Sequence, residues 1–170
     1  MAARAVTPLR RGLAPVLDTA TRVLVMGSFP SEASLAAGEY YAHPRNHFWP
    51  VMAVLTGEPL RERPYAQRIA ALRAHGIGLW DTIVACRRDG SLDAAIRDAT
   101  RAELARIRRM APQVALVAFN GTTAARAAPA FAAAGYATLA LPSTSPAHTM
   151  PFATKLAAWQ ALAERLAVAA

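Results

Sequence analysis

Residues 22–52 read RVLVMGSFPSEASLAAGEYYAHPRNHFWPVM, and the other parts of the chain can be placed around them. The segment begins with Val23–Met26, a continuous apolar run of the kind found in strands that are buried on both faces of a sheet. Gly27 ends this strand, and after Pro44 the apolar residues recur at helical spacing. Ligands of open α/β sheets bind beyond the carboxyl ends of the strands. The loop between Gly27 and Pro44 is therefore the expected ligand site.

The rest of the chain continues as an alternation of apolar strands and helical segments. We predict further strands at residues 77–84, 114–119 and 137–141, and helices at 45–56, 63–75, 92–96, 101–111, 120–134 and 151–168. Thr100 is expected to cap the helix over 101–111, with Glu103 completing a capping box. This order predicts a three-layer α/β/α sandwich around a central four-stranded, mostly parallel sheet.

A single domain accounts for most of the chain. A length of 170 residues suits one domain with a sizeable core, which we assign to residues 21–170. Residues 1–20 read as a basic N-terminal arm, loose except where Leu13–Leu17 dock. No apolar run reaches the ~18 residues that a membrane span requires, and the N-terminus does not resemble a signal peptide. We expect a monomer without a membrane partner.

Charge and cysteine content narrow the classes of function. The lone cysteine, Cys86, excludes an internal disulfide and a cysteine-based metal centre, so we expect the protein to work in the reducing cytoplasm. We expect the Cys86 side chain itself to be a small buried hydrophobe. The net charge is +8, and every basic residue except Lys155 is arginine. A GC-rich genome would explain arginine in place of lysine, but not the excess of base over acid. Because arginine pairs well with phosphate oxygens, this charge favours contact with nucleic acid.

Asp81 and Asn46 are the strongest candidates for chemistry. Asp81 stands within an apolar strand, where an isolated charge is costly. It therefore either faces a polar pocket or binds backbone N–H groups of the following loop. The amide of Asn46 can both donate and accept, so it could orient a water, read the edge of a base, or simply bond to the backbone at the start of a helix.

Other aromatic and polar groups gather in two loops. Tyr40 and Tyr41 could stack on a planar ligand, although such a pair more often belongs to the core or its rim. His43 and His47 have the spacing of metal ligands, but the proline between them and the lack of a third ligand nearby argue against a metal. Residues 142–149, PSTSPAHT, could grip phosphates ahead of a helix or form an ordinary capped turn.

Four segments together resemble the uracil-DNA glycosylase superfamily. They are GSFPS at 27–31, YYAHPRNHFWPVM at 40–52, GIGLWDTI at 76–83 and LPSTSPAH at 141–148. The resemblance is strongest to the hypoxanthine-DNA (deoxyinosine) glycosylase branch, with the mismatch-specific uracil/thymine glycosylases next. It implies a base-excision repair enzyme that flips a deaminated base out of double-stranded DNA and hydrolyses its N-glycosidic bond, without a metal or other cofactor.

The resemblance also implies roles for individual residues. Asn46 would position the attacking water, and His43 would help to stabilise the departing base. The flipped base would be bound by Gly27, Ser28, Phe29, Tyr41 and Asp81. The DNA backbone would be contacted by Arg45, Arg87, Arg88, Ser143, Ser145 and His148.

Two positions depart from relatives of this kind. Phe29 stands where mismatch-type relatives have the asparagine that positions the water, and Leu141 stands where other members have a catalytic histidine. These departures argue against strong uracil activity. The alternatives are a mismatch-specific uracil-DNA glycosylase, a non-catalytic DNA-binding relative, and a small-molecule hydrolase, which the net charge of +8 disfavours.

Overall fold

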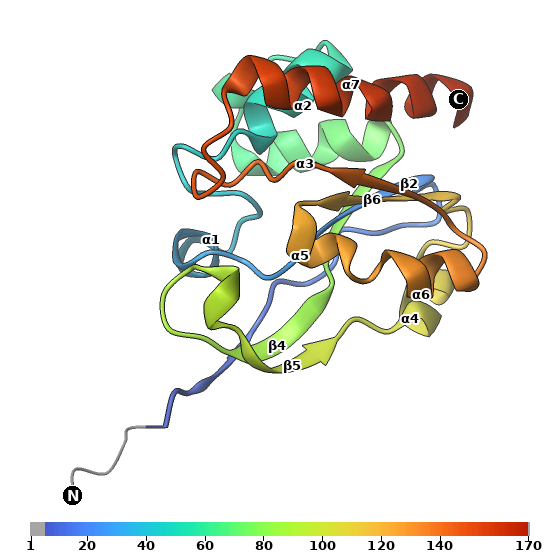
Figure 1. The fold of residues 1–170 in the computed structure, drawn as a ribbon. Coiled ribbons are helices and arrows are strands. Elements are labelled where there is room, and N and C mark those ends of the chain that lie inside the picture. Colours follow the sequence, from blue (N-terminus) through green and yellow to red (C-terminus); the bar gives the residue numbers. More distant parts are fainter. Residues whose placement is uncertain (1–5, 170) are drawn as a thin grey trace, which may run out of the picture.

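The computed structural model describes residues 6–169, so the predicted arm before residue 6 lies outside the described residues. The central sheet has four parallel strands in the order β3-β2-β6-β7. They are β2 (Val23–Gly27), β3 (Ile77–Asp81), β6 (Leu116–Asn120) and β7 (Ala137–Leu141). Figure 1 shows helices on both faces of this sheet, which confirms the predicted three-layer sandwich.

The two helical layers differ in the length of their helices. One face of the sheet carries α2 (Phe48–Thr56), η1 (Leu60–Glu62), α3 (Tyr65–Ala74) and α7 (Phe152–Ala169). The other carries α4 (Leu104–Met110), α5 (Thr122–Ala125) and α6 (Ala128–Ala133). Among residues 6–169, no helix is both long and apolar enough to cross a bilayer.

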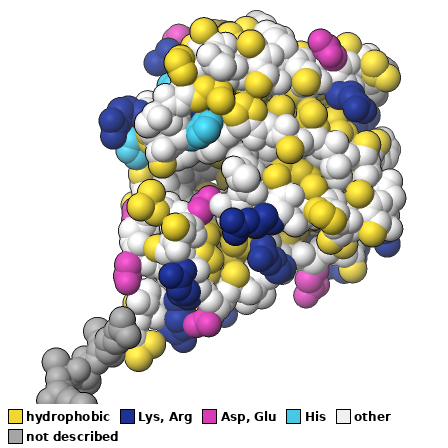
Figure 2. Space-filling model, in the orientation of Figure 1, with side chains coloured by type: hydrophobic (Ala, Val, Ile, Leu, Met, Phe, Trp, Pro, Cys, Tyr) yellow, Lys and Arg dark blue, Asp and Glu magenta, His cyan; other side chains and the backbone are white. Residues whose placement is uncertain are grey.

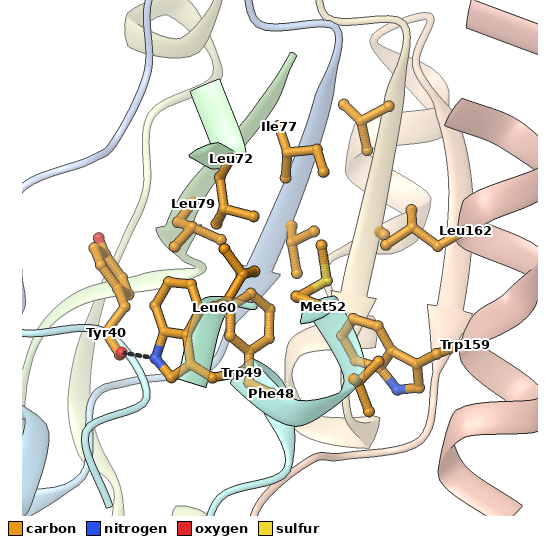
Figure 3. Packing of buried hydrophobic residues seen from close by; sticks show 14 of the residues in the cluster. Tyr40, Phe48, Trp49, Met52, Leu60, Leu72, Ile77, Leu79, Trp159 and Leu162 are labelled. Atoms are coloured by element: carbon orange, nitrogen blue, oxygen red, sulfur yellow. Dashed lines mark hydrogen bonds between the residues drawn. The ribbon is translucent and has the colours of Figure 1, made fainter. Parts of the chain in front are cut away.

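Strand β2 lies at the centre of the core because its side chains alternate between the two faces of the sheet. Val23 and Val25 pack in the cluster beneath α2, α3 and α7, whereas Leu24 and Met26 pack in the cluster on the opposite face. All four side chains are fully buried, as their continuous apolar run predicts. Figure 3 shows the first cluster, whose aromatic side chains include Tyr40, Phe48, Trp49 and Trp159.

A second, antiparallel sheet was not predicted. Its strands are β1 (Leu9–Arg11), β4 (Ile83–Arg87) and β5 (Arg97–Arg101), in the order β1-β4-β5. The predicted strand over 77–84 breaks at Thr82, whose N–H donates to the carbonyl of Gly27 at 2.8 Å and whose carbonyl accepts from Ala102 at 2.9 Å. The chain leaves the central sheet there and enters the second one. Within β5, Thr100 pairs with Ala85, so its predicted role as a helix cap is wrong.

The N-terminal segment is docked over a longer stretch than expected. β1 pairs with β4, and Val16 exchanges backbone hydrogen bonds of 2.8 and 2.9 Å with Leu79 of β3. Gly78 allows this approach, because a Cβ at that position would lie 2.7 Å from the carbonyl oxygen of Val16. The expectation of a loose arm is therefore wrong from Leu9 onward.

The predicted helices also need correction in four places. A short helix, α1 (Glu32–Ala37), was not predicted; the Ser31 hydroxyl caps it by accepting from Ser34 N–H. The helix expected over 120–134 is broken into α5 and α6. The predicted capping box at Glu103 is absent, because α4 starts without a side-chain cap. Residues 92–96 form only one turn, η2 (Asp93–Ala95).

Candidate active site

A cavity of about 280 Å³, the first cavity, opens beyond the carboxyl ends of β2, β3 and β6. Its walls come from the loops that follow β2, precede α2, connect β4 to β5, and connect β7 to α7. Figure 2 shows the surface hollowed among these loops. The predicted residues that line it are Gly27, Ser28, Phe29, Tyr41, Asn46, Asp81, Ser143, Ser145 and His148. Segments far apart in the sequence thus meet at the edge of the sheet where a ligand was expected.

Asp81 ends β3 and places a buried carboxyl group in the first cavity. The residue is 5% exposed, and its Oδ2 has no hydrogen-bond partner among residues 6–169. Gly27 on the neighbouring strand makes room for it, since a Cβ there would lie 2.5 Å from Oδ1 of Asp81. Burial, with a smaller contribution from the nearby Asp93, raises the pKa of Asp81 to about 7, against the opposing effect of Arg88. Of the two alternatives for Asp81, the geometry supports the one in which it faces a polar pocket.

Tyr41 brings an aromatic ring and a hydroxyl group to the same wall. Its ring stacks on Phe48 with centroids 3.9 Å apart and an angle of 23° between the planes. Its hydroxyl oxygen is buried and has no partner among the described residues. Burial and the nearby Asp81 raise the pKa of Tyr41, so the hydroxyl remains protonated at neutral pH. Tyr40 also lines the first cavity, but it packs in the core and its hydroxyl donates to the carbonyl of Ala14.

Asn46 lies at the start of α2 and lines the first cavity. Its Oδ1 accepts from the N–H of Phe48 at 2.9 Å, which satisfies one of the unpaired donors of the helix. Its Nδ2 has no hydrogen-bond partner within residues 6–169. From the sequence, Asn46 could either bond to the backbone at the start of a helix or face a ligand site. In the structure it does both.

His43 lies outside the first cavity. Its Nδ1 accepts from the N–H of Arg45 at 3.1 Å, so a neutral ring carries its proton on Nε2. The side chain lines a second cavity of about 230 Å³, which shares Tyr41 and Asn46 with the first. The prediction that His43 acts on the departing base does not fit this position. Within residues 6–169, no three His, Cys, Asp or Glu side chains are grouped as a metal site.

Arg88 is a structural residue in this fold. It is 1% exposed, and its guanidinium donates to the carbonyl of Pro30 and lies 4.9 Å from the ring centroid of Phe29. A buried arginine with these partners cannot reach a phosphate. The prediction that Arg88 contacts the DNA backbone is therefore wrong.

The other two predicted arginines differ in their surroundings. Arg87 belongs to the second sheet, where it pairs with Asp98 at 3.4 Å and donates to the carbonyl of Thr7. It lines neither cavity, so its predicted backbone contact does not fit the structure. Arg45 is exposed in the loop before α2 and remains a candidate.

Asn120 was not predicted as a site residue. It ends β6 and lines the first cavity. Its Oδ1 accepts from the N–H of Thr144 and its Nδ2 donates to the hydroxyl of Thr144, both at 2.9 Å, so it fixes the loop between β7 and α7. Lys155 holds the same loop by donating to the carbonyl of Ser145 at 3.1 Å. The sequence did contain a signal, because Asn120 ends an apolar strand as Asp81 does.

Two backbone donors complete the first cavity. The N–H groups of Ser28 and Phe29, which follow Gly27, have no acceptor among residues 6–169. Both residues line the cavity. The site thus combines free donors, a buried carboxyl group, an aromatic ring and an amide around a space close in size to the smallest ligand pockets, about 300 Å³.

Comparison with known proteins gives one consistent assignment. A family model described as the uracil DNA glycosylase superfamily matches residues 14–166. A protein of Methanosarcina barkeri named hypoxanthine DNA glycosylase is 35% identical over 150 residues, which cover 88% of this chain and 95% of that protein. A Methanosarcina acetivorans protein of the same name is 34% identical over 154 residues, covering 91% and 98%.

The fold comparison agrees with the sequence comparison. A solution NMR structure of a Methanosarcina acetivorans protein, described as a candidate uracil DNA glycosylase, matches with a TM-score of 0.85 and 34% identity. The match covers 94% of this chain and 99% of that one. Because the family model, the two named relatives and this fold each match most of the chain, the protein belongs to the uracil DNA glycosylase superfamily.

Proposed function

We propose that this chain is a hypoxanthine-DNA glycosylase, which as a monomer removes the deaminated base from double-stranded DNA. The names of the two curated relatives and the net charge of +8 support this function. The observation that carries it is the buried Asp81 carboxyl, which faces the first cavity with one oxygen free of partners. A buried polar atom of this kind is costly unless a ligand satisfies it.

Recognition of hypoxanthine follows from the donors and acceptors of the cavity. An oxygen of Asp81 accepts from the N1–H of hypoxanthine, and adenine has no hydrogen at that nitrogen. The free N–H groups of Ser28 and Phe29 donate to acceptors of the base, and Tyr41 contributes its ring. Adenine would leave the buried Asp81 oxygen unpaired, and a site that hydrogen-bonds its substrate rejects such analogues strongly.

Hydrolysis requires a water that is held beneath the anomeric carbon of the flipped nucleoside. The water oxygen bonds to C1′ while the bond from C1′ to the base breaks and its electron pair leaves with the base. The water loses a proton and the base gains one. Oδ1 of Asn46 keeps a second lone pair beside its bond from Phe48 N–H, so it can accept from this water. An amide is no general base, and its contribution is to position the water.

A cleavage assay on three labelled duplexes tests this function. The duplexes carry hypoxanthine, uracil or no lesion, and hot alkali after the reaction converts abasic sites into strand breaks. We expect the hypoxanthine strand to be cut fastest and the undamaged strand to remain intact. Faster cutting of uracil would replace the proposal with a mismatch uracil glycosylase. Binding without product from any duplex would identify a non-catalytic relative.

A further inference from the structure

We propose that the second cavity binds a backbone phosphate of the DNA strand from which the base is excised. This inference rests on the glycosylase function, because it requires a flipped nucleotide in the first cavity. It assigns a ligand to a cavity that none of the predicted DNA-backbone contacts lines.

The second cavity has the charge that a phosphate needs. It is lined by Tyr41, Ala42, His43, Pro44, Asn46, Trp49, Pro50, Arg61 and Arg68. Two guanidinium groups and an imidazole therefore converge on a space of about 230 Å³. No carboxylate is among the residues that line it within the described part of the chain. Arginine forks match phosphate oxygens in geometry as well as in charge.

Arg68 is already held in place for this task. Its Nε donates to the carbonyl of Arg63 at 2.8 Å and its Nη2 to the carbonyl of Arg61 at 3.2 Å. Its guanidinium also lies over Trp49, 5.4 Å from the ring centroid. These contacts leave Nη1 without a partner among residues 6–169. Arg61 is exposed, and no acidic group pairs with its side chain in the described residues.

The charges of the two cavities suit different parts of one nucleotide. Asp81 and Asp93 line the first cavity, which would repel a phosphate but can receive a neutral base. Tyr41 and Asn46 line both cavities and so lie between them. A sugar bridging base and phosphate would occupy this shared wall, with its anomeric carbon near Asn46.

The test removes a positive charge from the protein and a negative charge from the DNA, separately and together. Single phosphates around the hypoxanthine are replaced, one at a time, by neutral methylphosphonates, and duplex affinity is measured for the parent, Arg61→Gln and Arg73→Gln. Arg73 lies near the end of the same helix as Arg68, and within residues 6–169 its only ion pair is with Asp18 at 3.8 Å, so it is a matched control.

We expect one methylphosphonate position that weakens duplex binding by the parent and by Arg73→Gln roughly tenfold but weakens duplex binding by Arg61→Gln clearly less, because Arg68 remains in the cavity. Arg61→Gln should also reduce the slope of log K against log salt by about 1. If every position weakens Arg61→Gln as much as the parent, the phosphate site is overturned. Cleavage of the unmodified hypoxanthine duplex by the parent is measured in parallel. If the parent cleaves this duplex but the phosphate effect is missing, only the phosphate site fails; if it does not cleave, the glycosylase function itself fails.

Arg68→Gln serves as a second variant. Its contacts with Trp49 and two carbonyls make some loss of stability expected, so only preparations that retain the parent's circular dichroism are compared. In folded protein, the same methylphosphonate position should lose its effect. An effect that persists in both arginine variants would again overturn the site.

Discussion

Asn46 has two tasks that depend on different parts of one side chain. The bond from Phe48 N–H to Oδ1 stabilises the turn that leads into α2, and a hydrogen bond of this kind contributes about 1 kcal/mol. The proposed positioning of water uses the remaining lone pair of the same oxygen and the free Nδ2. A single substitution to alanine would therefore alter stability and activity together, and the two effects need separate variants.

Comparing Asn46→Ala with Asn46→Ser separates them. A serine hydroxyl can accept from the N–H two residues on, as Asn46 does, although more weakly, so Asn46→Ser should restore part of the stability lost in Asn46→Ala. Neither variant retains an amide at the cavity, so both should lose about 100-fold or more in the rate of base excision while binding the duplex as the parent does. Single-turnover cleavage and thermal unfolding measure the two properties. Parent-like excision by either variant would remove Asn46 from the mechanism.

Asp81 couples base recognition to stability. Its pKa of about 7 in the folded protein lies above its ordinary value of 3.8, mainly because it is buried. Between about pH 4 and pH 7 the folded state therefore keeps a proton that the unfolded chain has lost. The free energy of unfolding falls as the pH rises through this window, by at most about 4 kcal/mol.

The variant Asp81→Asn should remove this pH dependence. Asparagine has nearly the same shape and no charge, so the variant should be less sensitive than the parent to a change from pH 5 to pH 8, and the more stable of the two at pH 8. Urea unfolding at several pH values measures the difference. Glu62→Gln, at an exposed position on η1, is the control and should follow the parent. A parent and an Asp81→Asn variant with parallel pH profiles would contradict the assigned pKa.

Sequence patterns identified two residues of the first cavity for different reasons. Asp81 stands out because a carboxylate is unusual in an apolar strand, and Asn46 stands out because its amide lies in the segment that carries the family resemblance. Arg88 was misassigned because arginine alone does not reveal burial; only the fold brings the Pro30 carbonyl and the Phe29 ring to it. Asn120 was missed because its partner, Thr144, is 24 residues away.

At the scale of elements, the central sheet could be predicted and the second sheet could not. The buried strands are continuous apolar runs, whereas β5 reads RDATR and is exposed along its whole length. The break after Asp81 is likewise invisible in the apolar run over 77–84. At this break the N–H of Thr82 donates to the carbonyl of Gly27, the last residue of β2, and the N–H of Ile83 donates to the carbonyl of Ser28 in the loop that follows.

The loop between β7 and α7 depends on a buried clamp between Asn120 and Thr144. Asn120→Ala should destabilise the fold by about 1–3 kcal/mol, since it leaves the buried N–H and hydroxyl of Thr144 without their partner. Thr144→Val removes only the hydroxyl and should cost less. In the double variant the two losses should be less than additive, which urea unfolding of the four proteins measures. Strict additivity would show that the clamp does not contribute as a unit.

At the scale of the whole molecule, charge and chemistry occupy different places. The net charge is +8, yet among residues 6–169 no lysine or arginine lines the first cavity, where Asp81 and Asp93 lie instead. The basic field should govern how the protein meets DNA, because phosphate contacts release counterions and weaken with salt. The glycosidic bond breaks in a site that the described lysines and arginines do not line, so salt should affect this step little.

Raising NaCl from 50 to 200 mM therefore separates the two steps. We expect kcat/KM on a hypoxanthine duplex to fall by roughly tenfold or more, because each neutralised phosphate contributes to the salt dependence. The single-turnover rate at saturating protein should change less than about twofold, because the duplex is already bound and the partial charges around the base are screened little by bulk ions. If the single-turnover rate fell as steeply as kcat/KM, mobile cations or the exposed arginines would take part in the chemical step. The proposed separation between the charged surface and the cavity would then be wrong.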